Sequence, residues 1–420
     1  MDKFIVHQSK LSGTVKISGS KNAALPVMAA TLLTDQECLI QDVPDLKDIR
    51  TMIGILEVLG KKVHFEKSVL IIKNNDKKSY VAPYRLVRTM RASFCCLGPL
   101  LAKRKRAKVA LPGGCIIGPR PVDLHIKGLK ALGAEVAVEK GYCHAKAQSL
   151  KGAHIYLGGA FGSSVLATAN ILMAAVLAQG QTLIEHAACE PEMECLANFL
   201  KKMGADISGE GTPLIKIRGV QQLKGCEFRI IPDRIEAGTF IAASLSTRSS
   251  LCIQGANPCH LTSVIEIAKK IGASISIDKS SFIFVEPKDK LNPVNITTFA
   301  YPGFPTDLQA QFMACLCFTE GISLISEKIY PDRFMHVAEL NRMGAAVQRS
   351  GPYAIIEGKN SLYGAEIMAS DLRASAALVI ASLAAQGKSE ILRVYHIDRG
   401  YERIEEKLRL LGAKIRREKQ

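Results

Sequence analysis

One stretch of the sequence places a thiol among glycines, prolines and an arginine. It reads Pro112-Gly113-Gly114-Cys115-Ile116-Ile117-Gly118-Pro119-Arg120-Pro121. Glycine permits unusual backbone angles and proline restricts the chain, so such a loop can move along a limited path, as a lid over a reaction must. The same residues would also suit a tight hairpin that holds an inert cysteine. The spacing alone leaves both interpretations open.

A second group of chemically useful residues stands at the starts of six strongly apolar segments, residues 23–32, 92–101, 164–177, 238–245, 309–317 and 374–383. Just before each segment or in its first turn lie Lys21, Asn22, Arg91, Ser163, Ser164, Asp233, Asp307, Asp371 and Arg373. Serine and aspartate cap helices, which accounts for several of these residues. Capping does not explain Lys21, Arg91 or Arg373, because a cation at a helix start opposes the helix dipole.

These cations predict an anion-binding site. A cation at a helix start is reasonable mainly where an anion binds beside it, and six converging starts would attract phosphate groups strongly. Asp307 is placed as a potential base, because a carboxylate held against a substrate hydroxyl can accept its proton transiently even where cations lower its pKa. Arg399, in Tyr395-His396-Ile397-Asp398-Arg399-Gly400, could supply a further phosphate contact. Surface salt bridges remain the alternative for any single residue.

The elements that would carry these residues recur along the chain. An amphipathic stretch that ends in an apolar residue, glycine and alanine recurs at Gly133, Gly204, Gly272, Gly344 and Gly412, with a degenerate copy at Gly60. Successive glycines are 73, 71, 68, 72 and 68 residues apart. Glycine just past a helix takes a left-handed conformation that ends it, and alternating apolar residues then begin a strand. The pattern therefore indicates six similar units.

The apolar segments predict how these units are arranged. A helix without a polar face is buried on all sides, and six such helices cannot each be buried alone. We expect three of them to pack together at the centre of each of two domains. Strands and amphipathic helices would then form the outer layer. This is an inside-out α/β barrel, in which helices occupy the centre and strands lie outside, the reverse of a common α/β barrel.

Length and composition agree with two ordered domains. The chain has 420 residues, of which 48% are hydrophobic and 22% charged. No export signal is visible at the N-terminus, and the longest apolar run, residues 374–385, is too short to span a membrane. The twelve cysteines lack the spacing of a zinc site and lie mostly among apolar residues. We therefore expect a protein of the reducing cytoplasm.

The net charge of +16 is the strongest compositional signal. It suits nucleic acid, anionic lipid or a small, highly anionic substrate. The densest basic run is Lys103-Arg104-Lys105-Arg106, followed by Lys108. It contains no aromatic residue on which bases could stack, which favours a solvated turn.

At this point several motifs together resemble a known family. They lie at residues 18–26, 89–93, 111–125, 232–236, 304–311, 333–336, 371–375 and 395–403, and so extend over the whole chain. The sequence is similar to the UDP-N-acetylglucosamine 1-carboxyvinyltransferases, which belong to the enolpyruvyl transferase (EPSP synthase) family. These enzymes move the enolpyruvyl group of phosphoenolpyruvate to the 3′-hydroxyl of UDP-N-acetylglucosamine and release phosphate, the first committed step of peptidoglycan biosynthesis.

The resemblance implies a two-domain, inside-out α/β barrel with six βαβαββ-type repeats, three in each domain. One domain would span residues 21–231 and carry the lid. The other would span residues 232–420 together with the strand in residues 1–20, and would carry Asp307. The resemblance implies neither a metal nor an organic cofactor, and it leads us to expect a cytoplasmic monomer that binds no nucleic acid or membrane.

The resemblance also implies a role for each candidate residue. Cys115 would donate a proton to C3 of phosphoenolpyruvate, and Asp307 would take the proton of the sugar hydroxyl. The phosphate and other anionic groups would be held by Lys21, Arg91, Arg120, Arg373 and Arg399. The amino sugar and the nucleotide would be contacted by Asn22, Asp307, Pro121, Val122, Asp123, Leu124, Ser163, Ser164 and Ile329. Asp233, Asp371 and His125 would support these residues.

The sequence also departs from the family pattern. Residues 158–165 differ from the common form of the third repeat, and Tyr301 stands where a histidine is frequent. Cys115 is retained where some relatives carry aspartate, so we expect the epoxide fosfomycin to alkylate it.

Two other functions stay open. One is the shikimate-pathway enolpyruvyl transferase, which shares the fold but lacks the lid motif. The other is a basic nucleic-acid-binding repeat protein, which would not explain glycines and carboxylates grouped at helix starts.

Overall fold

The computed structural model describes residues 2–75, 79–112, 122–160, 162–278 and 281–419. The chain divides into two compact units, each with its own hydrophobic core. One unit runs from residue 19 to residue 231, and we call it the 19–231 unit. The other combines residues 2–18 with residues 232–419, and we call it the 232–419 unit.

The 19–231 unit contains two kinds of helix and a set of short strands. Its helices are α1 (Lys21–Ala30), α2 (Lys47–Val58), α3 (Tyr84–Val87), α4 (Leu97–Arg104), α5 (Asp123–Ala131), α6 (Val165–Ala175) and α7 (Pro191–Lys202), with 3-10 helices η1 (Thr31–Leu33) and η2 (Arg91–Cys96). Its strands are β3 (Cys38–Gln41), β4 (Lys61–Glu66), β5 (Val69–Asn74), β6 (Val81–Ala82), β7 (Arg106–Ala110), β8 (Glu135–Glu139), β9 (Tyr142–Lys146), β10 (His154–Tyr156), β11 (Gly158–Gly159), β12 (Gly162–Ser163), β13 (Gln181–Glu185), β14 (Asp206–Ser208), β15 (Leu214–Arg218) and β16 (Glu227–Arg229).

The 232–419 unit has the same composition of elements. Its helices are α8 (Arg234–Thr247), α9 (Thr262–Ile271), α10 (Gln309–Leu316), α11 (His336–Arg342), α12 (Leu372–Ala384) and α13 (Ile404–Leu410), with 3-10 helices η3 (Pro258–His260), η4 (Thr306–Leu308) and η5 (Val394–Arg399). Its strands are β1 (Asp2–His7), β2 (Thr14–Lys16), β17 (Leu251–Gln254), β18 (Ala273–Asp278), β19 (Phe282–Pro287), β20 (Ile296–Thr297), β21 (Gly321–Ser326), β22 (Ala346–Ser350), β23 (Tyr353–Gly358), β24 (Glu366–Met368), β25 (Lys388–Leu392) and β26 (Ile415–Lys419).

Within the described residues, each unit has three four-stranded sheets of one design. The orders are β16-β3-β5-β4, β6-β7-β9-β8 and β10-β13-β15-β14 in the first unit, and β18-β19-β17-β2, β20-β21-β23-β22 and β24-β25-β1-β26 in the second. Every sheet joins one parallel pair at an edge to two antiparallel pairs. A short ribbon of β11 and β12 is added in the 19–231 unit. The repeat predicted from the glycine spacing is therefore confirmed as one sheet with its helices.

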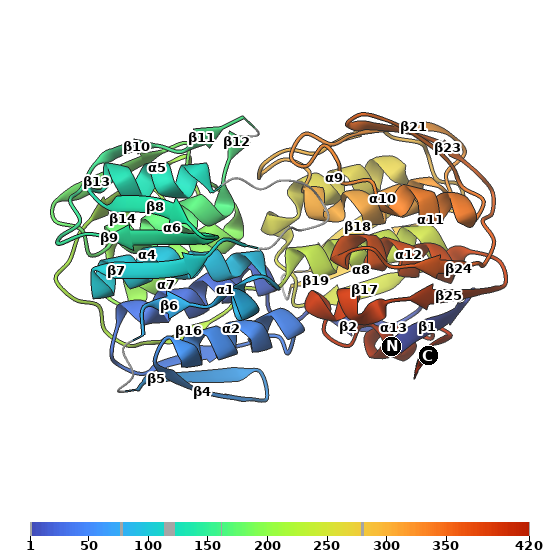
Figure 1. Cartoon of the computed structure of the whole chain (residues 1–420). Coiled ribbons are helices and arrows are strands. Elements are labelled where there is room, and N and C mark those ends of the chain that lie inside the picture. The colour runs from blue at the N-terminus through green and yellow to red at the C-terminus, as the bar shows by residue number, and fades with distance from the viewer. Residues whose placement is uncertain (1, 76–78, 113–121, 161, 279–280, 420) are drawn as a thin grey trace. The chain divides into compact units, whose positions relative to one another are not determined.

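Segments from distant parts of the chain complete individual sheets. Strand β1 lies between β25 and β26, with Phe4 opposite both Ile391 and Arg417, so the first strand completes the last repeat. Figure 1 accordingly places the two termini side by side in this unit. Strand β16 likewise pairs with β3, with Phe228 opposite Ile40. In each unit, a strand from near one end of the unit's sequence therefore completes a sheet formed near the other end.

The apolar segments form the centre of each unit, as the lack of a polar face predicts. In the 232–419 unit, α8, α10 and α12 contact one another, and in the 19–231 unit α6 contacts α4 while both α1 and α6 contact η2. Nearly every residue of these helices is buried. In each unit the strands lie around the helices (Figure 1). The inside-out α/β fold class is confirmed.

The second central helix begins later than the sequence predicts. We expected a helix over residues 92–101, but η2 occupies Arg91–Cys96 and α4 begins only at Leu97. Proline lacks an N–H and its ring collides with the carbonyl four residues earlier, so a helix tolerates it in the first turn. A start at Leu97 places Pro99 in that turn. The N–H of Gly98 then donates to the side chain of Asn170 at 2.8 Å.

The glycine anchors have the predicted conformation. Gly60, Gly133, Gly204, Gly272, Gly344 and Gly412 all have positive φ, between 89° and 128°. A side chain at such an angle is strained, which is why glycine recurs at the end of each amphipathic helix. A strand begins shortly after each of these glycines, as the alternating apolar residues predict.

No helix in the described part of the chain is long and apolar enough to cross a membrane.

Candidate active site

Asp307 lies between two buried arginines in the 232–419 unit. It belongs to η4, directly before α10. Its Oδ1 accepts a hydrogen bond from Nη1 of Arg333 and its Oδ2 accepts one from Nη2 of Arg373, both at 2.8 Å. Arg333 and Arg373 are 6% and 3% exposed, so solvent screens these ion pairs weakly. The start of α10 therefore presents a carboxylate whose two oxygens are held in place.

The charges around Asp307 determine its ionisation. Burial opposes the ionised carboxylate, but the nearby charges of Arg373 and Arg333, together with their hydrogen bonds, more than offset this effect. The pKa of Asp307 is consequently well below its usual range. The carboxylate is therefore ionised at neutral pH and can receive a proton, although its low pKa makes it a weak base until a substrate is held against it.

Arg373 stands at the helix start where the sequence predicted an anion-binding cation. Its backbone N–H donates to the side chain of Asp371 at 2.8 Å, and Asp371 is the N-cap of α12. Its guanidinium lies over the ring of Tyr401, 5.4 Å from the ring centroid. The opposition between this cation and the helix dipole is offset within the protein, because Asp307 pairs with the guanidinium. The positive charge of Arg373 at the start of α12 is thus balanced by the negative charge of Asp307 at the start of α10.

The third central helix of this unit begins nearby. Asp233 caps α8 by accepting hydrogen bonds from the N–H groups of Ile235 (2.8 Å) and Glu236 (3.1 Å). The charge of Asp233 also contributes to raising the pKa of Arg373, after the larger effects of burial, which lowers it, and of Asp307, which raises it. Buried Glu236 pairs with Lys407 at 2.6 Å. Within this unit, the charged starts of α8, α10 and α12 therefore influence one another.

Two buried residues of this site were not among the candidates drawn from the sequence. Arg333 binds Asp307, and the carboxylate of Glu327 accepts a hydrogen bond from Thr306 beside it at 2.9 Å. Neither residue lies at the start of a central helix, so the pattern used to find candidates passed over them. Arg333 was nevertheless inside a recognised motif, at residues 333–336.

The remaining candidates of this unit occupy two loops. Ile329 lies two residues after Glu327, and its N–H donates to that carboxylate at 2.9 Å. Arg399 is half-buried and ends η5. The adjacent Asp398 pairs with Arg417 at 2.6 Å, which ties η5 to β26. Both loops are thus anchored by buried or paired carboxylates.

Lys21 begins α1 in the 19–231 unit. The helix is capped by Ser20, whose hydroxyl accepts a hydrogen bond from the N–H of Ala23 at 3.3 Å. The ammonium group of Lys21 lies 3.2 Å from Asp48 in the first turn of α2, and both side chains are largely buried. Asn22 follows in α1 and is half-buried. Here too a cation at a helix start is balanced by a carboxylate from a neighbouring helix.

Arg91 and His125 lie close together in the same unit. Arg91 is half-buried at the start of η2. His125 is buried in α5, and its Nδ1 lies 2.8 Å from the amide nitrogen of Asn170. Burial, reinforced by the charge of Arg91, lowers the pKa of His125 to about 3. His125 is therefore neutral at physiological pH, and Nδ1 accepts the hydrogen bond that Asn170 donates.

The residues expected to contact the nucleotide begin just before α5. Val122 is the N-cap residue and packs against the core of the unit. Asp123 is exposed in the first turn, where a negative charge suits the helix dipole. Leu124 is half-buried, and its Cδ1 is so near Gly159 of β11 that a Cβ atom on that glycine would lie only 3.2 Å from it. The start of α5 and the β11–β12 ribbon are thus close neighbours.

Ser163 and Ser164 lie in the segment that departs from the family pattern. Ser163 belongs to β12 and pairs with Gly158 of β11. Ser164 is the N-cap of α6, because its hydroxyl accepts a hydrogen bond from the N–H of Ala167 at 3.3 Å. The Ser164 side chain thus has a structural partner, whereas Ser163 lies on the ribbon beside α5.

Three candidates, Cys115, Arg120 and Pro121, fall outside the described residues. The interpretation of residues 113–121 as a lid therefore remains a prediction. Among the described candidates, the structure brings together Asp307, Arg373 and Asp371 in one unit and Arg91 with His125 in the other.

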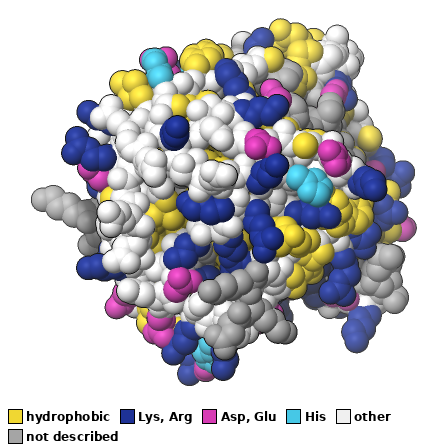
Figure 2. Space-filling model, turned by 60° about the vertical axis from the view of Figure 1, so that its left-hand side comes forward, with side chains coloured by type: hydrophobic (Ala, Val, Ile, Leu, Met, Phe, Trp, Pro, Cys, Tyr) yellow, Lys and Arg dark blue, Asp and Glu magenta, His cyan; other side chains and the backbone are white. Residues whose placement is uncertain are grey.

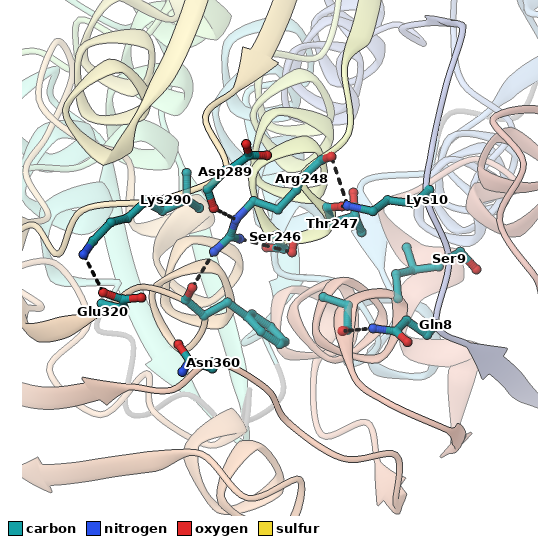
Figure 3. A pocket seen from close by; sticks show the side chains of 14 residues that line it. Gln8, Ser9, Lys10, Ser246, Thr247, Arg248, Asp289, Lys290, Glu320 and Asn360 are labelled. Carbon is teal, nitrogen blue, oxygen red and sulfur yellow. Dashed lines mark hydrogen bonds and ion pairs between the residues drawn. The ribbon is translucent and has the colours of Figure 1, made fainter.

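A cavity of about 590 Å³ in the 232–419 unit is not this site (Figure 3). It lies where α8 and α10 end, whereas Asp307 and Arg373 lie where α10 and α12 begin. Two of the cations that line it cap carbonyl groups: Lys10 donates to Thr247 at 2.8 Å, and Arg248 donates to Phe318 at 2.7 Å. Cations favour helix ends for this reason. Lys290, the third cation of the lining, pairs with Glu320 at 2.7 Å, so each of these cations has a partner within the protein.

The basic side chains do not form one block. Figure 2 shows Lys and Arg spread over one face and interrupted by hydrophobic and acidic side chains. In the run from Lys103, the first two residues end α4 and Arg106 begins β7, so only Lys105 forms the predicted turn. Lys103 pairs with Asp35 at 2.8 Å, and Arg106 lies 4.0 Å from the ring centroid of Tyr80. The run is therefore part of the local packing.

The described residues contain no group of three or more His, Cys, Asp or Glu side chains that could hold a metal ion. The cysteines that the structure describes are all free, and most are buried. Burial raises the pKa of Cys143 to about 11 and that of Cys317 to about 12, so these thiols stay protonated and unreactive.

Comparison with known sequences gives a consistent picture. The sequence model of EPSP synthase (3-phosphoshikimate 1-carboxyvinyltransferase) matches residues 5–408. The chain is 54% identical over 418 residues to a UDP-N-acetylglucosamine 1-carboxyvinyltransferase of Methylacidiphilum infernorum, covering 99% of both chains. It is 51% identical over 419 residues to UDP-N-acetylglucosamine 1-carboxyvinyltransferase 2 of Carboxydothermus hydrogenoformans, again covering 99% of both chains.

Comparison with solved structures supports the fold. The enolpyruvyl transferase NikO from Streptomyces tendae matches with a TM-score of 0.89 at 23% identity, covering 99% of this chain and 98% of that one. EPSP synthase from Acinetobacter baumannii matches with a TM-score of 0.78 at 19% identity, covering 100% of both chains.

Proposed function

Because this chain belongs to the EPSP synthase family of enolpyruvyl transferases, we propose that the charged helix starts described above form its active site. The chain is an enzyme that transfers the enolpyruvyl group of phosphoenolpyruvate to the 3′-hydroxyl of UDP-N-acetylglucosamine, with release of phosphate. This reaction serves peptidoglycan synthesis. The high identity to relatives with this activity favours it over the shikimate-pathway reaction, since the EPSP synthase structure is only 19% identical.

The chemistry requires a base, an acid and a cationic site. The sugar 3′-oxygen forms a bond to C2 of phosphoenolpyruvate and loses its proton, while C3 gains a proton. The resulting tetrahedral intermediate then loses phosphate from C2 and a proton from C3, which restores the double bond. Cations stabilise the negative charge of such an intermediate more than that of the separate substrates.

In our proposal, Asp307 accepts the proton of the sugar hydroxyl. The observation that carries this assignment is its position between Arg333 and Arg373, which holds both oxygens and keeps the carboxylate ionised. A carboxylate that is fixed in this way can be aligned with a substrate hydroxyl without rearrangement. An approaching anion would compete for the two guanidinium groups, which would raise the pKa of Asp307 and strengthen it as a base.

Anionic groups of the substrates would be bound by cations at several helix starts. We assign this role to Lys21, Arg91, Arg120, Arg373 and Arg399. Lys21 is already paired with Asp48, which fixes the direction of its ammonium group. Arginine suits phosphate because its planar guanidinium donates two parallel hydrogen bonds.

Further contacts would select the sugar nucleotide. Asn22 and Asp307 would bind the amino sugar. Pro121, Val122, Asp123, Leu124 and Ile329 would line the nucleotide region, with Ser163 and Ser164 beside them. His125, Asp233 and Asp371 would hold these segments in place.

Cys115 would protonate C3 of phosphoenolpyruvate and would be the residue that fosfomycin alkylates. We further propose a cytoplasmic monomer without a nucleic-acid partner. The dispersed and partly paired basic side chains support the last point.

The experiment that tests the function measures phosphate release from phosphoenolpyruvate. UDP-N-acetylglucosamine and shikimate 3-phosphate are compared as acceptors at equal concentration. We expect release only with the sugar nucleotide, together with a product whose mass exceeds that of the acceptor by one enolpyruvyl group. Release with shikimate 3-phosphate instead would favour the alternative enzyme. Absence of release with either acceptor, combined with a salt-sensitive mobility shift of DNA or RNA, would favour the nucleic-acid-binding alternative.

A further inference from the structure

The carboxylate of Glu327 is fully buried directly after strand β21. Its Oε1 accepts hydrogen bonds from the hydroxyl of Thr298 at 2.7 Å and from the N–H groups of Ile329 at 2.9 Å and Tyr330 at 3.0 Å. Its Oε2 accepts one from the hydroxyl of Thr306 at 2.9 Å. A buried carboxylate needs such donors, and here they come from three separate segments of the chain.

The Thr306 hydroxyl carries a single proton, so the direction of its hydrogen bond with Glu327 decides how it can bind Arg333. The hydroxyl of Thr306 uses its one proton to donate to Oε2 of Glu327. The oxygen of Thr306 then offers a lone pair to Arg333, whose Nη1 donates to it at 3.1 Å. Glu327 thus fixes which way the Thr306 hydroxyl faces.

The same nitrogen of Arg333 reaches Asp307. Nη1 carries two hydrogens, and it donates to Thr306 at 3.1 Å and to Oδ1 of Asp307 at 2.8 Å. Both partners together fix the rotation of the guanidinium. An unbroken chain of hydrogen bonds therefore leads from Glu327 through Thr306 and Arg333 to Asp307.

We propose that Glu327 is a positioning residue for the base Asp307, acting through Thr306 and Arg333. The proposal rests on the proposed function, in which Asp307 accepts the substrate proton. Glu327 makes no contact with the reacting atoms in this scheme. It keeps Thr306 an acceptor toward Arg333, and thereby keeps one oxygen of Asp307 in place.

The substitution Glu327→Gln tests the direction of the hydrogen bond between Thr306 and residue 327, with almost no change in the size of the side chain. The oxygen of the amide must stay where Oε1 accepts three hydrogen bonds, so its NH₂ group faces Thr306. Thr306 must then accept from glutamine and turn its own proton elsewhere, which weakens its bond with Arg333.

Two threonines provide a matched pair of variants. Thr298 and Thr306 both donate to Glu327, at 2.7 and 2.9 Å, but Thr306 also accepts from Arg333. Thr298 instead accepts from the N–H of Lys328 at 2.9 Å. Thr298→Val and Thr306→Val each remove one hydroxyl donor from the same carboxylate. Only the second interrupts the chain to Asp307.

The experiment measures kcat, KM for UDP-N-acetylglucosamine and the melting temperature of each variant. We expect Glu327→Gln and Thr306→Val each to lower kcat about tenfold or more, because misplacing a catalytic group by a fraction of an ångström has effects of this size. KM should change much less than kcat. Thr298→Val removes its hydrogen bonds with Glu327 and Lys328, so it should lower the melting temperature, but it leaves the bond between Thr306 and Arg333 intact and should keep kcat within about twofold of the wild type.

Two further measurements separate positioning from general structural support. The double variant of Glu327→Gln and Thr306→Val should lose no more activity than the worse single variant, because both break one chain. Thr306→Ser, which retains the hydroxyl, should recover most of the activity lost in Thr306→Val. Equal loss of kcat in Thr298→Val and Thr306→Val, or additive losses in the double variant, would overturn the proposal.

The wild-type assay distinguishes failure of this proposal from failure of the proposed function. If the wild type releases no phosphate with UDP-N-acetylglucosamine, the proposed function fails first and the positioning role falls with it. If the wild type is active and Asp307→Ala is inactive, but Glu327→Gln and Thr306→Val keep full kcat, only the positioning role is wrong.

Discussion

Nη2 of Arg373 lies 2.8 Å from Oδ2 of Asp307, although the two residues are 66 positions apart. This ion pair joins the start of α12 to the start of α10. Each charge alone would be unfavourable in so buried a place, and together with Arg333 they form a compact charged cluster. The properties of Asp307 therefore depend on Arg373 of the next repeat as well as on Arg333 of its own repeat, and the second prediction tests the dependence on Arg373.

Asp307→Ala should abolish turnover while UDP-N-acetylglucosamine still binds. A positioned general base contributes about 10²- to 10⁴-fold to the rate, so we expect kcat to fall within or beyond this range. Phosphate release gives the rate and titration calorimetry gives the binding. Asp332→Asn is a matched control, because Asp332 pairs with Arg349 at 2.8 Å on the surface. Loss of binding with residual chemistry intact would show the base assignment to be wrong.

Arg373→Gln should make the activity more sensitive to acid. The charge of Arg373 helps to keep the pKa of Asp307 low, so its removal raises that pKa. As pH falls, Asp307 in the variant will then become protonated, and lose its function as a base, at a higher pH than in the wild type. We expect the ratio of kcat/KM at pH 5.5 to that at pH 8 to be smaller in Arg373→Gln than in wild type. Arg349→Gln, at the surface pair, should leave the ratio unchanged; an unchanged ratio in Arg373→Gln would contradict the prediction.

His125 should make the protein less stable in mild acid. Burial lowers its pKa to about 3 from the ordinary 6.5, so the folded protein keeps it neutral while the unfolded chain takes up a proton below pH 6.5. Its contribution to the free energy of unfolding is therefore fully present above pH 6.5 and is lost progressively as the pH falls toward 3. Between pH 7.5 and pH 5.5 this amounts to about 1.4 kcal/mol.

Denaturant unfolding at these two pH values measures the effect. The loss of unfolding free energy should be smaller in His125→Gln than in the wild type. His64→Gln serves as control, because the His64 side chain is 69% exposed. His336 is also buried, with a pKa lowered to about 4, and it adds a similar dependence that both variants retain. Equal losses in His125→Gln and wild type would show that His125 does not supply this dependence.

Fosfomycin should inactivate the enzyme by forming one adduct on Cys115. Most other cysteines are unreactive, since burial raises the pKa of Cys195 to about 12, for example. Cys259 is exposed, so it provides an internal comparison for general thiol alkylation. Peptide mass spectrometry should locate the adduct on Cys115 and not on Cys259. Full activity in excess fosfomycin, without an adduct on Cys115, would refute the assignment.

Much of the fold could be predicted from local patterns. The spacing of Gly60, Gly133 and their four counterparts gave the number of repeats, and the positive φ of each glycine explains why the pattern is visible. The central helices could be predicted because burial on all sides leaves no polar face. Their precise starts could not, since Pro99 moves the start of α4 to Leu97 and Asn170 supplies the missing partner of Gly98.

The candidate site was predicted less completely. Asp307 and Arg373 were found because both stand at the start of an apolar helix, where a cation such as Arg373 opposes the helix dipole. Arg333 and Glu327 lie outside that pattern, and their importance appears only through the chain of contacts that reaches Asp307. The structure adds a contact that the sequence pattern does not specify: the arginine at the start of α12 binds a carboxylate of the protein itself.

The sequence by itself determined the repeats, the apolar helices and the family, because each depends on residue type and regular spacing. Only the tertiary structure decided which charges meet. The interaction between Asp307 and Arg373 depends on two helices that pack side by side, and the position of Arg333 depends on a loop held by Glu327. Electrostatic effects depend on distance and burial, and the spacing of residues along the sequence specifies neither.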